Sequence, residues 1–231
     1  MNENVFYTAI FGNNVPIDKP EYFDKIEGWD YILFTNFEPS LFNTSWDIIK
    51  VDKPFDCNVM CARNIKWNGH QYLDKYKKMV WMDAYVKFKK NNEELEQIYL
   101  MLEKNNKDIM FKKHPMRNCI YRECEEVIRA KKDNNNNVSI NKNVFIRDKM
   151  PVNFGLFETN IIFYNNKKNV RDFMKIVFDF MIGKSYRDQL SLTYNIWRHR
   201  FKDYMSLNYV DIQSLIIGKP PENHTPIAYI S

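Results

Sequence analysis

The sequence predicts an α/β domain with a mainly parallel β-sheet that is flanked by helices. Through the first hundred residues, segments rich in β-branched and aromatic side chains alternate with segments of helical periodicity, a pattern typical of βαβ units. The chain has 231 residues, of which 45% are apolar and 16% aromatic. That length fits one domain and that composition can fill its core. We therefore expect a single domain over residues 1–231.

Apolar segments that end at turn-forming residues predict the strands. Gly12 follows the first of them and Gly28 precedes the second, as expected where a buried strand gives way to a turn. Strands are expected at residues 5–11, 31–35, 46–51, 79–88, 108–111 and 160–164.

Between these segments the apolar spacing changes to a helical period. Asn91 or Asn92 is a plausible cap for one of the helices, which has acidic residues in its first turn. The asparagine run at residues 134–137 predicts a solvated loop, and residues 218–231 are rich in proline and irregular. Helices are expected at residues 58–76, 92–103, 120–131, 169–181 and 187–201.

Composition argues against several classes of protein. The net charge of +5 arises from 34 basic and 29 acidic residues that are scattered along the chain, so a nucleic-acid partner is not expected. There is no apolar run long enough for a transmembrane span, and the N-terminus lacks the basic region of a signal peptide. The six glycines form neither a dinucleotide-binding fingerprint nor a P-loop. A protein of the cytoplasm, free or peripheral at a membrane, is expected.

The four cysteines raise the question of a structural zinc site. Cys57 and Cys61 are separated by three residues, and Cys119 and Cys124 by four. This spacing is looser than that of zinc-binding pairs, so reduced and packed thiols are the favoured interpretation. Reduced thiols agree with a cytoplasmic environment.

Asp83 is the one acidic residue in the apolar segment at residues 79–86. An unpaired buried carboxylate is costly, so Asp83 must face water, a partner or a metal ion. One interpretation is a strand end that surfaces into a loop. The other is a carboxylate at the carboxyl edge of the sheet, where it would hold a divalent ion that bridges diphosphate oxygens.

Six short blocks occur in a defined order between residues 5 and 197. They are Tyr7-Thr8-Ala9-Ile10-Phe11-Gly12, Asp30-Tyr31-x-x-Phe34-Thr35, Ala62-Arg63-x-x-Lys66, Trp81-Met82-Asp83-Ala84, His114-x-x-Arg117-x-x-x-Tyr121-x-Glu123 and Arg187-Asp188-Gln189. In this combination the chain resembles a family of GT-A-type glycosyltransferases found in bacterial polysaccharide clusters and large DNA viruses, with relatives among plant Golgi proteins. The resemblance implies a GT-A-like (Rossmann-like) fold and transfer of a hexosyl or related sugar. The donor would be a nucleotide-diphosphate sugar, the acceptor a hydroxyl of a glycan or polysaccharide, and the cofactor Mn²⁺ or Mg²⁺.

The resemblance also implies a donor site. Arg63 and Lys66 lie three residues apart, so on a helix they share a face that suits a diphosphate. Two solvated cations on an amphipathic helix are the alternative. The residues placed at the donor are Thr8, Ala9, Phe11, Arg63, Lys66, Asp83 and Ala84.

Asp83 stands where the family has a two-acid metal motif, but positions 81 and 85 are Trp81 and Tyr85. A metal ion would therefore need another ligand, and His224 in the C-terminal segment is the candidate. The alternative is that His224 is merely exposed.

A polar cluster near the helix at residues 120–131 has the composition of an acceptor site. An ordinary helix start with solvated polar residues would explain it as well. The acceptor-binding candidates are His114, Arg117, Tyr121, Glu123, Arg187 and Gln189.

An inverting transferase needs a carboxylate that takes the proton of the acceptor hydroxyl. Asp188 is the first candidate for this catalytic base, although a role as a helix cap would also explain it. Glu158 is the second candidate.

Two other functions remain open. The missing second acid beside Asp83 favours a nucleotide-sugar- or glycan-binding module without turnover. A metal-dependent hydrolase that uses Asp83 and His114 is less favoured, because the sequence has no H-E-x-x-H or comparable two-histidine spacing.

Overall fold

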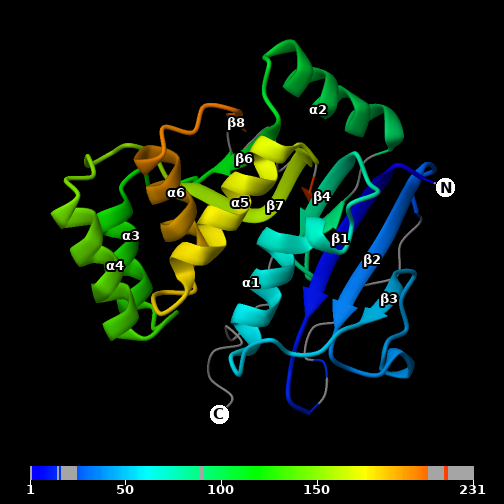
Figure 1. Cartoon of the computed structure of the whole chain (residues 1–231), viewed down its shortest axis with the longest axis horizontal. Helices are drawn as coiled ribbons and strands as arrows, with labels where there is room; N and C mark the ends of the chain where they lie inside the picture. The colour runs from blue at the N-terminus through cyan, green and yellow to red at the C-terminus, as the bar shows by residue number, and fades with distance from the viewer. Residues whose placement is uncertain (1, 15, 17–24, 89–90, 208–215, 218–231) are drawn as a thin grey trace.

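A seven-stranded sheet forms the centre of the computed structural model, which describes residues 2–14, 16, 25–88, 91–207 and 216–217. Its strand order is β3-β2-β1-β4-β7-β6-β8 (Figure 1). The strands are β1 (Asn4–Ile10), β2 (Trp29–Thr35), β3 (Asp47–Lys50), β4 (Lys78–Met82), β6 (Ile109–Lys113), β7 (Phe157–Asn165) and β8 (Tyr204–Leu207). The short strands β5 (Lys87–Phe88) and β9 (Ile216–Ile217) form a separate antiparallel pair.

Strand direction decides where the ends of the strands meet. β7 runs antiparallel to both of its neighbours, β4 and β6, whereas the other pairs in the large sheet are parallel. The carboxyl ends of β1, β4 and β6 and the beginning of β7 therefore lie along one edge. In sheets of this kind that edge is where ligands bind.

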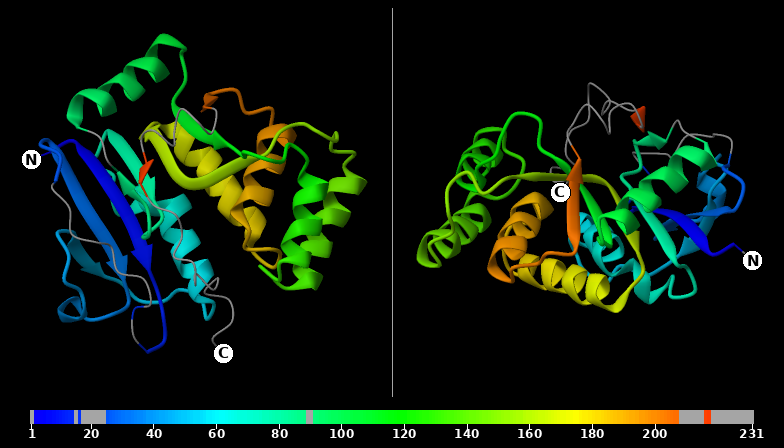
Figure 2. Two further views of the ribbon diagram at one scale, coloured as in Figure 1. Left: turned by 180° about the vertical axis from the view of Figure 1, so that it is seen from behind. Right: turned by 90° about the horizontal axis from the view of Figure 1, so that it is seen from above.

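The helices cover both faces of the sheet. They are α1 (Asn58–Asn68), α2 (Asn92–Lys104), α3 (Ile120–Arg129), α4 (Asn135–Arg147), α5 (Lys168–Met181) and α6 (Asp188–Arg198). Helices α1, α5 and α6 pack side by side on one face, and α2 covers the other (Figure 2). Helices α3 and α4 form a pair that packs on α6 around a third apolar cluster. None of the helices in the described part of the chain is both long and apolar enough to cross a membrane.

A buried tyrosine joins helix α1 to the sheet. The hydroxyl of Tyr7 on β1 donates to the carbonyl of Lys66, 2.8 Å away, and lies 2.8 Å from the hydroxyl of Tyr164 on β7. Gly69, directly after α1, lies so close to this ring that a Cβ atom there would come within 2.7 Å of Tyr7 Cε2. The end of α1, and Lys66 with it, is thus fixed against β1.

The structure confirms the predicted fold class and most of the predicted elements, but it corrects two boundaries. The helix expected over residues 58–76 ends at Asn68 and continues as a 3₁₀ turn, Gly69–Gln71. The strand expected over residues 79–88 ends at Met82. Asp83 therefore follows the strand instead of lying at its middle.

The asparagine run is the clearest error of the sequence interpretation. It does not form a loop, because Asn134 caps helix α4 by accepting from the backbone N–H of Asn136, 2.8 Å away, and the following asparagines form the first turn. Asparagine is a poor interior helix residue but a good cap, which explains how a low-complexity run begins a helix. The strand β8 was also not expected from the sequence.

All four cysteines are free thiols, and three of them are buried. Among the described residues, no three His, Cys, Asp or Glu side chains gather as a metal site would require. The packing expected for the cysteines holds for Cys61, Cys119 and Cys124, whereas Cys57 is exposed.

Candidate active site

Asp83 lies in a tight turn at the carboxyl end of β4. Its backbone N–H donates to the carbonyl of Asn160 on β7 at 2.8 Å, and its carbonyl accepts from Val86 at 2.8 Å. The indole Nε1 of Trp81 donates to Asp83 Oδ1 at 2.8 Å. The carboxylate is 24% exposed, so it reaches solvent while its backbone and one oxygen are held in place.

Lys66 lies beneath this turn and is fully buried. Its Nζ atom is 2.6 Å from Asp188 Oδ2 and 3.5 Å from Asp83 Oδ1. The same ammonium lies 5.4 Å from the ring centre of Trp81, within cation–π range. Because Lys66 is fully buried, a donor could contact its ammonium directly only if the surrounding side chains moved.

Asp188 is bound by two cations. Arg63 Nη1 lies 3.3 Å from the Asp188 oxygen that also contacts Lys66, and the Asp188 side chain is 2% exposed. Burial alone would raise the pKa of Asp188, but Arg63 and Lys66 outweigh it and hold that pKa well below its usual range. Asp188 is thus a permanent anion near neutral pH, and it links helix α6 to helix α1.

Asp188 is not the cap of helix α6. It is the first residue of the helix, Arg187 occupies the cap position, and no side chain in the described part of the chain caps this end. An acidic side chain in the first turn is still favourable to the helix dipole. The interpretation of Asp188 as a helix cap is corrected by this position.

A buried carboxylate holds the segment that leads into α6. Asp133, which follows helix α3, accepts from the Ser185 hydroxyl at 2.6 Å and from the Tyr186 backbone N–H at 3.0 Å. The Tyr186 carbonyl in turn accepts from Arg63 Nε at 3.3 Å. The sequence did not indicate a role for Asp133, because its partners lie more than fifty residues away and form no local motif with it.

The second polar cluster follows β6. His114 Nδ1 accepts from the backbone N–H of Arg117 at 3.0 Å, and Arg117 Nε donates to Glu123 Oε2 at 2.6 Å. Burial lowers the pKa of His114 to about 4, with further lowering by Arg117, Lys112 and Lys132. The His114 ring is therefore neutral near pH 7.

Glu158 lies between the two clusters. It opposes Lys112 across the β6–β7 ladder and forms an ion pair with it. Tyr85 lies near both Glu158 and Asp83, since burial raises its pKa and the carboxylates of Asp83 and Glu158 raise it further. Glu158 is 20% exposed, and of the carboxylates considered as a base it is the more open.

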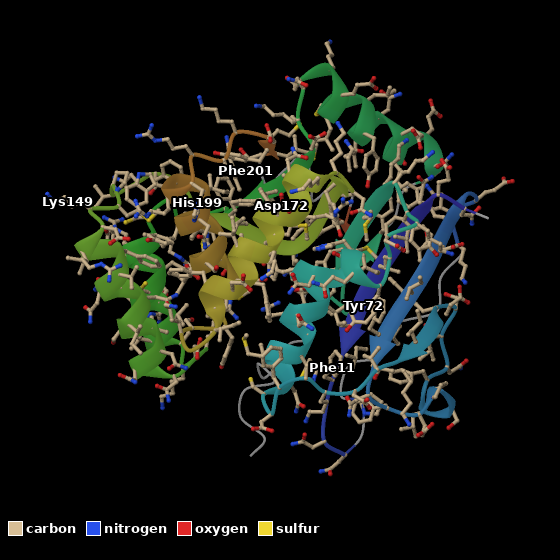
Figure 3. All side chains as sticks on the ribbon, viewed as in Figure 1. Phe11, Tyr72, Lys149, Asp172, His199 and Phe201 are labelled. Carbon is tan, nitrogen blue, oxygen red and sulfur yellow. The ribbon has the colours of Figure 1, made fainter. Side chains whose placement is uncertain are left out.

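The remaining donor-site candidates lie at the end of β1 and after β4. Phe11, labelled in Figure 3, lies near the start of α1, where its ring is buried. Thr8 and Ala9 are buried as well, so this part of β1 could offer a ligand only its backbone. Ala84 follows Asp83 in the turn and is partly exposed.

Of the remaining acceptor-site candidates, Arg187 and Gln189 lie on either side of Asp188 in the sequence, and Tyr121 contacts another part of the chain. Arg187 Nη2 donates to Gln189 Oε1 at 3.4 Å beside Asp188. The Tyr121 hydroxyl instead contacts the carbonyls of Phe145 and Met150, at 3.1 and 2.7 Å. Tyr121 thus fixes the end of α4 and has its hydroxyl engaged there. Lys149, which follows the end of α4, lies at the outer edge of the molecule in Figure 3.

At this turn Asp83 offers a carboxylate oxygen for a divalent ion, and the described residues contain no group of three His, Cys, Asp or Glu side chains around it. Trp81 and Lys66 both approach Asp83 Oδ1, which leaves Oδ2 for another partner. A carboxylate oxygen suits Mn²⁺ or Mg²⁺, so Asp83 fits as a single ligand and not as a complete site. His224, the expected second ligand, lies outside the described residues.

Comparison with known proteins gives one family match and one match to a solved structure. The sequence model of a family described as TOD1/MUCI70, glycosyltransferase-like domain, matches residues 36–214, well over half of the chain. The crystal structure of mouse xyloside xylosyltransferase 1 in its apo form superposes with a TM-score of 0.47 at 10% identity. That superposition covers 93% of this chain and 92% of the mouse chain. No curated protein sequence matches the chain.

The substitution Asp188→Asn is expected to lower the free energy of unfolding by about 3 kcal/mol or more at pH 7, because it leaves the charge of Lys66 buried without its nearest partner. The folded-state pKa of Asp188 lies below the ordinary value, so its stabilisation is present above about pH 4 and is lost as the pH falls through the folded-state pKa. Urea denaturation between pH 7 and pH 3 should show that the difference in the free energy of unfolding between wild type and variant becomes smaller as the pH falls.

Asp172→Asn is the matched control, since Asp172 is 58% exposed in a helical pair with Lys168. Exposed pairs of this kind contribute little, so this variant should stay close to wild type. If Asp188→Asn lowers the free energy of unfolding no more than Asp172→Asn does, or by the same amount at every pH, the proposed role of Asp188 is wrong.

Proposed function

The chain belongs to the TOD1/MUCI70 family of glycosyltransferase-like domains, and from this we propose that it moves a sugar from a nucleotide-diphosphate sugar to a hydroxyl of a glycan or polysaccharide. The supporting observation is the cluster of Arg63, Lys66, Asp83 and Asp188 at the carboxyl edge of the sheet. It combines fixed positive charge with a partly exposed carboxylate. That is the chemistry which binds a diphosphate and stabilises it as it departs.

In this proposal Arg63 makes the direct contact with the diphosphate. Its side chain is 15% exposed, whereas Lys66 is fully buried. Lys66 acts from beneath by holding the carboxylates of Asp83 and Asp188 at fixed positions. The backbone at the end of β1 would support the nucleotide, because the side chains there are buried.

A divalent ion, Mn²⁺ or Mg²⁺, belongs to the proposal at Asp83. When bound, such an ion neutralises negative charge that develops on the departing nucleotide. Asp83 Oδ2 would be one ligand, and His224 is proposed as another. Asp83 is held in this orientation by Trp81 and Lys66.

We assign the role of catalytic base to Glu158 in preference to Asp188. Asp188 is 2% exposed and bound by two cations, and its lowered pKa makes it a weak proton acceptor. Glu158 lies between the donor cluster and the cluster around His114, where an acceptor hydroxyl would enter. Its ion pair with Lys112 would orient the carboxylate.

The acceptor is proposed to bind around His114, Arg117, Gln189 and Arg187. The neutral ring of His114 and the ion-paired guanidinium of Arg117 provide a rigid polar surface beside Glu158. The alternative function is a binding module without turnover, which the single acidic ligand at Asp83 favours. A cytoplasmic location remains a prediction from the sequence.

A thermal-shift panel of UDP-, GDP-, dTDP- and CMP-sugars, with and without MnCl₂, tests the donor site. One sugar nucleotide should raise the melting temperature by several degrees at saturation, because stabilisation grows with the ratio of ligand concentration to Kd. Asp83→Asn should remove the part of the shift that depends on manganese. Asp74→Asn, an exposed change nine residues earlier, should leave it intact. If no sugar nucleotide shifts the melting temperature, the donor assignment is wrong.

Glu158→Gln tests the base. Loss of a general base typically slows the chemical step by about 10²- to 10⁴-fold, so sugar transfer should fall by that factor while donor binding, measured by calorimetry, stays within twofold. Glu125→Gln on the exposed side of α3 is the control and should transfer normally. Equal transfer rates for Glu158→Gln and wild type would exclude this role, and binding without transfer in wild type would support the binding module.

A further inference from the structure

Two cations meet where the segment after α3 touches the segment before α6. The Tyr186 hydroxyl donates to the carbonyl of Lys132 at 3.2 Å, and Asp133 binds Ser185 and the backbone of Tyr186. These contacts hold the two segments together. Burial and then the charge of Arg187 lower the pKa of Lys132, so the two cations, one from each segment, lie near each other. Both side chains are partly exposed.

The neighbouring charges are already matched. Arg117 pairs with Glu123, and Lys112 pairs with Glu158. The carboxylate of Asp133 accepts hydrogen bonds from hydroxyl and backbone donors, including the Asn134 N–H at 2.6 Å. None of these anions forms an ion pair with Lys132 or Arg187.

Lys132 and Arg187 thus remain as cations without an ion-pair partner among the described residues. The one side-chain contact of Arg187 is the 3.4 Å hydrogen bond to Gln189, and its Nε atom is buried without a partner in the described part of the chain. A buried guanidinium N–H without an acceptor is unfavourable, so this N–H is free to donate to an acceptor that a ligand brings. Burial lowers the pKa of Lys132 and the nearby Arg187 lowers it further, whereas Glu123 and Glu126 raise it. These two carboxylates form their ion pairs with Arg117 and Arg129 instead.

The location connects these cations to the proposed chemistry. Arg187 directly precedes Asp188, which binds Arg63 and Lys66 on the donor side. Lys132 lies near His114 and Arg117, and its charge contributes to the lowered pKa of His114. A group held by Lys132 and Arg187 would therefore lie beside the proposed acceptor position.

We propose that Lys132 and Arg187, with the amide of Gln189, form a subsite for an anionic group of the acceptor, a carboxylate or a phosphate carried by the glycan. The inference rests on the proposed transferase function and narrows its acceptor to an acidic saccharide. Arg187 supplies a planar fork that matches two anionic oxygens, and Lys132 supplies a point charge. The donor diphosphate uses the separate cation Arg63.

Calorimetry on the full chain with three probes tests the subsite: methyl glucuronoside, glucose 6-phosphate and methyl glucoside. At least one anionic probe should bind about tenfold or more tightly than the neutral glucoside, since hydrogen bonds to charged groups are the stronger ones. The better of the two anionic probes identifies the group as carboxylate or phosphate. Binding should weaken as salt is added.

Lys132→Gln should weaken the binding of the anionic probe about tenfold and leave the binding of the neutral probe unchanged. Lys131→Gln, the exposed neighbour, is the matched control and should bind as wild type does. Arg187→Gln provides a second variant should Lys132→Gln alter the melting temperature. Equal binding of anionic and neutral probes, or equal effects of the two lysine substitutions, would overturn the proposal.

Competition with UDP and MnCl₂ separates this subsite from the donor site. Saturating UDP should leave the anionic probe bound. Complete displacement would assign Lys132 and Arg187 to the donor phosphates and overturn the inference. Failure of UDP to bind at all, with the anionic probe still bound, would count against the proposed transferase function and not against the anion site.

Discussion

The buried ion pair between Lys66 and Asp188 is the interaction on which the rest of the site depends. A fully buried ammonium is stable only if nearby carboxylates and aromatic faces replace the water that it has lost. The Lys66 ammonium lies 2.6 Å from Asp188 and 3.5 Å from Asp83. Arg63, which also contacts Asp188, brings the group to two positive and two negative charges. Helix α1, the beginning of α6 and the turn after β4 are joined through these four side chains.

This constraint assigns different roles to residues of similar chemistry. Asp188 is an anchor because two cations enclose it, whereas Asp83 is partly exposed and keeps one oxygen for another ligand. Lys66 likewise orients its neighbours from beneath, and Arg63 reaches the surface. Groups that are fixed before a ligand arrives need little reorganisation when charge develops, which is how electrostatic catalysis is achieved.

Local sequence patterns predicted the parts of the site that depend on local structure. The alternation of strands and helices predicted the sheet, and the three-residue spacing of Arg63 and Lys66 placed them on the helix face where both now contact Asp188. The pairing of Asp133 with Ser185 had no such signal, because it joins residues 52 apart. The length of α1 was overestimated, since its end is set by the contact of Gly69 with Tyr7 rather than by apolar periodicity.

The central claim is that the cluster around the buried pair binds the diphosphate of the donor. Calorimetric measurement of UDP binding to wild type, Arg63→Gln and the exposed control Arg122→Gln tests it most directly. Arg63→Gln is expected to raise the Kd by about tenfold or more, the loss expected for a charge-assisted hydrogen bond, whereas Arg122→Gln should leave the Kd unchanged. An unchanged Kd for Arg63→Gln in a folded protein would contradict the account.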